Sequence, residues 1–444
     1  MASSSSSEQG NPYRIHTHYD FLPILCGSNR RRKLLYLVAV AFTLSLFFFV
    51  QEVHMSEEPL TQPLSSPYIP TTHIDAPSPP VTFIEPVVFT FIMWSESAAA
   101  EGALLIKSIL LYNSQPSDIH IICDEKAEEL LRTRFSLVEH PPHHVRVWFY
   151  RPSWQSMLDR VKREGSINTD HSAGLPGLMK LFIHEIIPPT VKKSIYIDTD
   201  ALFISDPTLL WNVFATLNTS TAIVMASHPE QDAPEWHHAS KICSCVMLLD
   251  LEKLRDQRLM DSSIYRDLGD FPALSPEAFR FKYGLPGGDG KGRYDNVRLG
   301  DQGYWWAIVD YRPDIFEPLS FDFEVTSCLL DTYLTGLGNE LISPEQELSY
   351  QIHTKDTPQE GRVVLPKLLH FNCLHGTDVY MDWSGWLDPS NPLNIRWGPA
   401  VSYHAGFKWI WLNTGQTSNI AQTLEVVTVS DIIFADEMAA KRHL

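Results

Sequence analysis

The stretch S-I-Y-I-D-T-D-A-L-F-I-S-D-P, residues 194–207, places two carboxylates one residue apart at the end of an apolar run. Residues 195–197 predict a short buried strand. Two acids this close repel each other, and burying them is costly unless a cation compensates their charge. In a strand, residues i and i+2 project to the same side. Asp198 and Asp200 are therefore expected to converge on one divalent cation, and their hard oxygen ligands suit Mn²⁺ or Mg²⁺ rather than zinc.

Strand-like and helix-like segments alternate along the chain on both sides of this pair. Strands are predicted at 87–93, 118–124, 145–150, 220–227, 244–251 and 363–372, and helices at 99–112, 127–135, 174–187 and 301–309. This alternation predicts an α/β fold with an open, largely parallel sheet flanked by helices. Ligands of such sheets bind beyond the carboxyl ends of the strands, which is where the two aspartates fall.

The N-terminal part predicts a membrane anchor. Four basic residues, 30–33, precede the apolar run 34–50, and acidic residues follow it. By the positive-inside rule, residues 1–33 form a cytosolic tail, 34–50 a transmembrane signal anchor, and the rest of the chain is lumenal. A cleaved signal peptide fits less well, because the basic segment starts too late and no small-residue cleavage site follows the run. The proline-rich residues 51–86 predict an extended stem.

Composition limits the possible partners. The chain has 444 residues, 44% of them hydrophobic, and a formal net charge of −18. This hydrophobic content is that of a folded protein, and the negative charge argues against a nucleic acid as partner. Any anionic substrate must then be bound by a metal ion or by locally placed cations.

Four segments occur in the order typical of one enzyme family. They are 177–188 (GLMKLFIHEIIP), 196–211 (YIDTDALFISDPTLLW), 299–309 (LGDQGYWWAIV) and 368–372 (LLHFN). From about residue 87 to 380 the chain resembles glycosyltransferase family 8, most of all the xylosyltransferase-type domain of LARGE and the glucoside xylosyltransferases. The resemblance implies a GT-A fold, a nucleotide-diphosphate sugar donor, Mn²⁺ and retention of the anomeric configuration.

The resemblance also assigns a metal site. Asp198 and Asp200 match the metal-binding Asp-x-Asp pair, and His370 matches the histidine that completes the site from a late strand. A divalent ion held there would neutralise the charge that develops on a departing nucleoside diphosphate. Without the family order, the aspartates would fit turn or cap residues and His370 would fit a core or surface histidine.

Other matched positions lie around the donor sugar. Lys180 matches a basic residue near the donor, and the resemblance implies that Asp198 also lies near the donor's ribose. Asp301 and Gln302 match an acidic-amide pair on the far face of the sugar, where they would stabilise an oxocarbenium-like transition state electrostatically or by covalent attack. The competing interpretations are a solvated helix lysine for Lys180 and a helix N-cap for Asp301.

The match fails at a donor-contacting signature. The family has Asn-x-Gly where this chain has Cys243 and Cys245. Cys243 therefore stands at a donor-binding position, and an inactive, membrane-tethered sugar-nucleotide- or glycan-binding module is the alternative function. His375 stands near the position of a phosphate-binding lysine and is a weaker candidate for a metal ligand or phosphate donor.

Three further features leave alternatives open. A strand ending in Asp-x-Asp also occurs in haloacid-dehalogenase phosphatases, but Ala201 and the mid-chain position disfavour that class. The histidines 228, 237 and 238 suggest a second metal site, although surface histidines in a proline-rich loop fit better. The five cysteines beyond the anchor allow one or two disulfides or buried free thiols. The tripeptide 218–220 is an N-glycosylation sequon.

These observations together predict a Golgi type II membrane protein with a lumenal catalytic domain. The domain is expected to span 87–400, followed by an extension, 401–444, of unassigned role. The expected donor is a UDP-sugar, with xylose or glucose as the sugar, and the acceptor is a glycan or glycoprotein.

Overall fold

Strand β1 (Val87–Met93) pairs in parallel with a strand on each side near the middle of an open sheet. In spatial order the eight strands are β11 (Leu424–Val429), β3 (Val145–Tyr150), β2 (Ser117–Cys123), β1, β4 (Lys193–Ile197), β7 (Ile242–Asp250), β6 (Ile223–Ser227) and β8 (Phe316–Leu319). Neighbours are parallel except that β7 runs antiparallel to both β4 and β6. The predicted α/β fold with an open sheet is confirmed, and the sheet is mixed.

The computed structural model describes residues 85–165, 167, 169, 171–231, 238–275, 278–279, 282, 299–328, 343–350, 354–415 and 422–442. All of these lie in one compact unit, Val81–Leu444. The expected anchor, 34–50, the stem up to residue 84 and residues 283–298 lie outside the described residues. Within the described ranges, none of the helices is long and apolar enough to cross a membrane.

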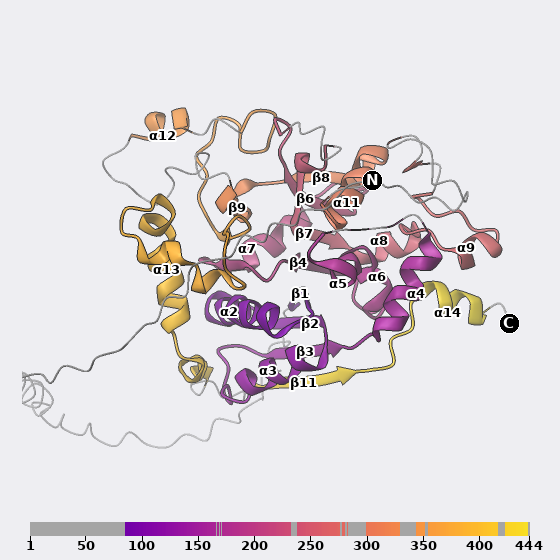
Figure 1. Ribbon diagram of the computed structural model, residues 1–444, viewed down its shortest axis with the longest axis horizontal. Helices are drawn as coiled ribbons and strands as arrows, with labels where there is room; N and C mark the ends of the chain where they lie inside the picture. Colours follow the sequence, from indigo (N-terminus) through magenta and orange to yellow (C-terminus); the bar gives the residue numbers. More distant parts are fainter. Residues whose placement is uncertain are drawn as a thin grey trace, which may run out of the picture. The chain divides into compact units, whose positions relative to one another are not determined.

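Helices cover both faces of the sheet. Figure 1 shows α2, α3 and α13 on one side of it and α4, α5, α6, α8 and α14 on the other. The helices are α2 (Glu96–Tyr112), α3 (Glu125–Phe135), α4 (Trp154–Glu164), α5 (Gly174–Leu178), α6 (Ile183–Ile186), α7 (Thr208–Trp211), α8 (Leu251–Asp256), α9 (Ser263–Asp267), α11 (Asp301–Tyr311), α12 (Pro344–Tyr350), α13 (Pro392–Gly406) and α14 (Ala435–Arg442).

The core is split in two by the sheet. Along β4, Ile195 and Ile197 join the hydrophobic cluster under α2, whereas Tyr196 between them joins the cluster under α5 and α6. This follows from the strand period of two, which sends alternate side chains to opposite faces. Because both faces are covered, the central strands are mostly apolar and do not alternate strictly between apolar and polar residues.

A second, smaller sheet extends the region beyond β4. It contains β5 (Ala201–Phe203), β10 (Leu368–His370) and β9 (Val325–Thr326), with β10 in the middle. Strand β10 pairs antiparallel with β5 and parallel with β9. The prediction of a long strand over 363–372 was therefore wrong in extent. Residue 366 is a proline, which removes a backbone donor before the strand begins.

The predicted helix over 174–187 is also interrupted. Helix α5 passes into a 3-10 turn, η1 (Met179–Phe182), before α6 begins. Gly177, near the end of α5, disfavours a continuous α-helix, since glycine loses the most conformational freedom on folding. The tighter turn contains Lys180.

The segment 401–444 contributes a strand to the eight-stranded sheet. Strand β11 pairs with β3 over six residue pairs and forms the sheet edge shown in yellow in Figure 1. Helix α14 is held by the buried Asp436, whose carboxylate accepts hydrogen bonds from Arg163 and Ser262. Near β10, Cys328 and Cys373 form a disulfide. Cys123, Cys243 and Cys245 are buried free thiols.

Candidate active site

Asp198 and Asp200 lie in the turn between β4 and β5, one and three residues beyond the end of β4. The strand rule that motivated their convergence therefore does not apply. Hydrogen bonds fix the turn instead. The backbone N–H of Asp198 donates to the Cys245 carbonyl at 2.8 Å, and the N–H of Phe371 donates to the Asp200 carbonyl at 2.9 Å. The two carboxylates are each 27% exposed, so the pair is open to a ligand from solvent.

His370 ends β10 and faces this turn, as the family resemblance predicted. Its Nε2 lies 3.4 Å from Asp200 Oδ1, and the side chain is 3% exposed. One ligand atom each from Asp198, Asp200 and His370 lies within 4.8 Å of the others. Burial opposes ionisation of Asp200, but the adjacent His370 lowers the pKa of that carboxyl below its ordinary value.

Lys180 connects the aspartate pair to the start of α11. Its Nζ lies 2.9 Å from Asp198 Oδ1 and 3.4 Å from Asp301 Oδ1. Tyr196 also donates its hydroxyl to Asp198 at 2.6 Å. Burial alone would lower the pKa of Lys180, but the two carboxylates raise it well above its ordinary value. Lys180 is thus a buried, ion-paired cation, and the solvated-lysine interpretation is excluded.

Asp301 is the first residue of α11 but does not cap it. The N-cap residue is Gly300, and no side chain caps the helix. The Asp301 carboxylate accepts a hydrogen bond from Ser244 Oγ at 2.8 Å and faces Lys180. Burial raises the pKa of Asp301 above its ordinary value in spite of the lysine. Gln302 points elsewhere, since its Nε2 donates to the Ala239 carbonyl at 2.9 Å.

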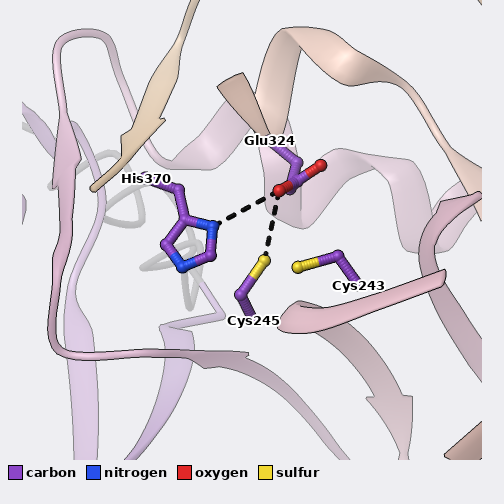
Figure 2. A group of neighbouring side chains, drawn as sticks. All are labelled: Cys243, Cys245, Glu324 and His370. Atoms are coloured by element: carbon purple, nitrogen blue, oxygen red, sulfur yellow. Dashed lines mark hydrogen bonds and ion pairs between the residues drawn. The ribbon is translucent and has the colours of Figure 1, made fainter. Parts of the chain in front are cut away.

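A register shift between β6 and β7 sets the directions of the Cys243, Ser244 and Cys245 side chains. Met225 pairs with Met247, but the following residue, Ala226, pairs with Cys243. Such a bulge re-aims side chains beside a site. Ser244 points to Asp301, whereas Cys243 and Cys245 point into a separate cluster with Glu324 and His370. Figure 2 shows these four side chains converging.

Glu324 is fully buried and was missed by sequence reasoning. Its Oε1 lies 3.3 Å from His370 Nδ1 and accepts from Cys245 Sγ at 3.4 Å, and its Oε2 lies 3.3 Å from His228 Nε2. Burial would raise the pKa of Glu324, but the two histidines lower it to about 2. His228 is 3% exposed, so the expectation of a surface histidine was wrong: it stacks on Phe321 with ring centroids 4.9 Å apart.

Glu101 is a second acid that sequence reasoning missed. It projects from α2, where its Oε1 accepts from the Tyr380 N–H at 2.8 Å and its Oε2 from the Thr199 hydroxyl at 3.2 Å. Burial, followed by the charge of Asp200, raises the pKa of Glu101 to about 7. The signal was present, because Glu101 is the only acid within the apolar stretch from residue 97 to 112.

The remaining sequence candidates lie apart from these contacts. His375 is exposed in the loop after β10. His238 has a left-handed backbone (φ 62°), and His237 lies outside the described residues. The site therefore has an open carboxylate pair, a buried histidine between that pair and Glu324, and a buried lysine between two acids. Carboxylate oxygens and an imidazole nitrogen fit a Mn²⁺- or Mg²⁺-class ion, with room at the exposed side for a ligand's oxygens.

Comparison with curated proteins finds similarity to transferases. No family model matches the chain. The chain is 28% identical over 210 residues to human "Xylosyl- and glucuronyltransferase LARGE2", which covers 44% of this chain and 28% of that protein. It is 36% identical over 119 residues to human "Xylosyl- and glucuronyltransferase LARGE1", which covers 27% of this chain and 15% of that protein. The chain thus spans less than a third of the length of these relatives.

Two solved structures of glycosyltransferases align with this chain. Mouse xyloside xylosyltransferase 1 in its apo form aligns over 66% of this chain and 100% of its own, with 17% identity and a TM-score of 0.44. The galactosyltransferase LgtC in complex with donor and acceptor sugar analogs aligns over 72% of this chain and 95% of its own, with 14% identity and a TM-score of 0.45.

Proposed function

We propose that this chain is a metal-dependent glycosyltransferase of GT-A fold and family 8 type, which transfers a sugar from a UDP-sugar to a glycan or glycoprotein. The observation that carries the proposal is the grouping of Asp198, Asp200 and His370 at the carboxyl end of β4, with one ligand atom of each within 4.8 Å of the others. The similarity to xylosyl- and glucuronyltransferases over 210 residues supports the same activity. Retention of configuration, and xylose or glucose as the donor sugar, are carried over from the family resemblance.

The three ligands would hold Mn²⁺ or Mg²⁺, and the ion would supply positive charge to the leaving diphosphate as a Lewis acid. Tyr196 and Lys180 fix Asp198 in place from the buried side, so its orientation is set before a ligand arrives. His370 is fixed between Asp200 and Glu324. This pre-organisation matters because a group that is already oriented costs little reorganisation during the reaction.

Lys180 and Asp301 act on the donor side of the proposed site. Lys180 carries a charge that is buried and already paired, and it lies next to the residue expected near the donor's ribose. Asp301 is held by Ser244 and Lys180, so its carboxylate is positioned to stabilise positive charge on the sugar. Gln302, which the resemblance paired with Asp301, has its amide oriented by the Ala239 carbonyl. We assign the electrostatic role to Asp301 for this reason.

The proposed cellular location and membrane topology rest on the N-terminal sequence. The basic residues 30–33, the apolar run 34–50 and the proline-rich stem support a single-pass type II protein of the Golgi with a lumenal catalytic domain. The disulfide Cys328–Cys373 suits an oxidising compartment.

A second candidate function is a sugar-nucleotide- or glycan-binding module without turnover. It is favoured by one observation, the direction of Cys243, whose side chain joins the cluster around Glu324 although the family has a donor-contacting asparagine there. A panel of UDP-sugars, offered to the purified full chain with and without Mn²⁺, separates the two functions. Mn²⁺-dependent release of UDP from at least one donor supports the transferase. Tight UDP binding without release from any donor supports the binding module.

A further inference from the structure

Behind the aspartate pair, the structure brings together four side chains that the proposed transferase does not use as a set. These are Cys243, Cys245, Glu324 and His370, which come from β7, from the residue before β9 and from β10 (Figure 2). One ligand atom from each lies within 4.8 Å of every other. Two thiols, a carboxylate and an imidazole are together a donor set for a thiophilic divalent cation.

The spacing of these atoms matches a tetrahedral site. With zinc bonds of about 2.3 Å to sulfur and about 2.0 Å to nitrogen or oxygen, the edges of a tetrahedron measure about 3.3 to 3.8 Å. Cys245 Sγ lies 3.4 Å from Glu324 Oε1, and His370 Nδ1 lies 3.3 Å from the same oxygen. Two of the six edges of the tetrahedron are thus already formed, and closure requires the other four to reach similar lengths.

Burial and outer contacts favour a structural rather than a catalytic cation. Glu324 and Cys245 are 0% and 2% exposed, and even Cys243 is only 9% exposed. Water therefore has little access to a cation bound by these side chains. Structural zinc sites are closed in this way, with all four ligands from the protein. His228 lies 3.3 Å from Glu324 Oε2 and would orient the carboxylate from outside, as the partners of metal ligands do.

We propose that Cys243, Cys245, Glu324 and His370 form a binding site for a zinc-class cation, which lies next to the manganese-class site at the aspartate pair and shares His370 with it. The register shift in β7 supports the pairing of the thiols, because Cys243 and Cys245 point into this cluster whereas Ser244 points to Asp301. The two cysteines that depart from the family's Asn-x-Gly signature then have one explanation together: they exchange a donor-sugar contact for two thiolate ligands.

The two sites share His370. Its Nδ1 faces Glu324 and its Nε2 faces Asp200 at 3.4 Å. A neutral imidazole binds a metal through one nitrogen and carries its proton on the other. A cation bound through Nδ1 would leave Nε2–H to donate to Asp200, so zinc at the buried site removes His370 from the ligands of the aspartate site. Zinc and manganese therefore compete although their sites differ.

Metal content and cobalt spectroscopy test the site on the purified full chain. After removal of metals and incubation with one equivalent of Zn²⁺, elemental analysis should find about one zinc per chain. With Co²⁺ instead, we expect thiolate-to-cobalt charge-transfer absorption and intense tetrahedral visible bands. Cys245→Ser should abolish the charge-transfer band or weaken it strongly, while the matched control Cys123→Ser, a buried free thiol on β2, should retain it. A wild-type chain that retains no zinc, or shows octahedral cobalt bands only, overturns the proposal without the use of any variant.

Manganese binding tests the sharing of His370. By electron paramagnetic resonance of Mn²⁺, the zinc-loaded chain should bind manganese at least tenfold more weakly than the zinc-free chain. Equal affinity in the two forms would overturn the four-ligand set. None of these readouts depends on sugar transfer. Failure here together with normal UDP release would leave the proposed function standing, whereas normal cobalt bands without UDP release would do the reverse.

Discussion

Glu101 offers a sharp test of the charge balance around the aspartate pair. Burial and the neighbouring Asp200 raise its pKa from 4.5 to about 7, so the folded chain holds a proton on Glu101 that the unfolded chain has released. Between these two values the folded state binds more protons, and stability must therefore fall as the pH rises. Since one pKa unit corresponds to about 1.36 kcal/mol, the loss across this range amounts to about 3 kcal/mol.

Glu101→Gln removes this titration and keeps the shape of the side chain. The amide oxygen can still accept the hydrogen bond from the Tyr380 N–H. The free energy of unfolding of the variant, measured with urea in the presence of a chelator, should gain about 3 kcal/mol relative to wild type between about pH 5 and about pH 8. The matched control is Glu96→Gln, an exposed glutamate on the same helix, which should follow wild type at each pH.

The same unfolding measurements in saturating Mn²⁺ test the effect of a bound cation on Glu101. A divalent cation beside Asp200 would lower the pKa of Glu101, because an opposite charge favours the ionised form. The difference between Glu101→Gln and wild type should then shrink. Equal pH dependence of the two proteins in chelator would refute a raised pKa of Glu101, as would a loss of stability of the variant relative to wild type as the pH rises.

Two further predictions concern buried charges. Asp436→Asn should cost about 3 kcal/mol or more of unfolding free energy, because it leaves Arg163, at 2.7 Å, and Arg160, at 3.5 Å, without their shared buried partner. Urea unfolding checks this, and an unchanged midpoint would contradict it. Lys180→Met should bind Mn²⁺ at least about tenfold more tightly but release UDP more slowly, because it removes a cation 2.9 Å from Asp198. Weaker manganese binding would mean that Lys180 supports the metal rather than opposing it.

Local pattern predicted most of the central sheet. The predominantly apolar runs at 87–93 and 145–150 became β1 and β3 with the predicted bounds, because a strand covered on both faces is mostly apolar. The edge strand β11 was not predicted. Its residues are only half-buried or exposed, and it pairs with β3, which lies far away in the sequence. A pairing of this kind leaves no local periodic signal.

The candidate site was predictable where its residues lie close together in the sequence. Asp198 and Asp200 stand together in the sequence, and the family order brought His370 to them. Glu324 escaped notice because it contacts partners from three separate strands or loops, although an acid between the buried Phe323 and Val325 was a signal of burial. His228 was misjudged because a proline follows it, and only the tertiary contact with Glu324 reveals its place.

We expect sugar transfer to depend on a cation held by the aspartate pair. Asp200→Asn measures it most directly, with Mn²⁺-dependent UDP release by the full chain as the readout and the exposed Asp378→Asn as the matched control. Since a bound cation contributes several kcal/mol to leaving-group stabilisation, Asp200→Asn should lower the rate at least about 100-fold, with the melting temperature retained. A folded Asp200→Asn chain that releases UDP at the wild-type rate would contradict the claim.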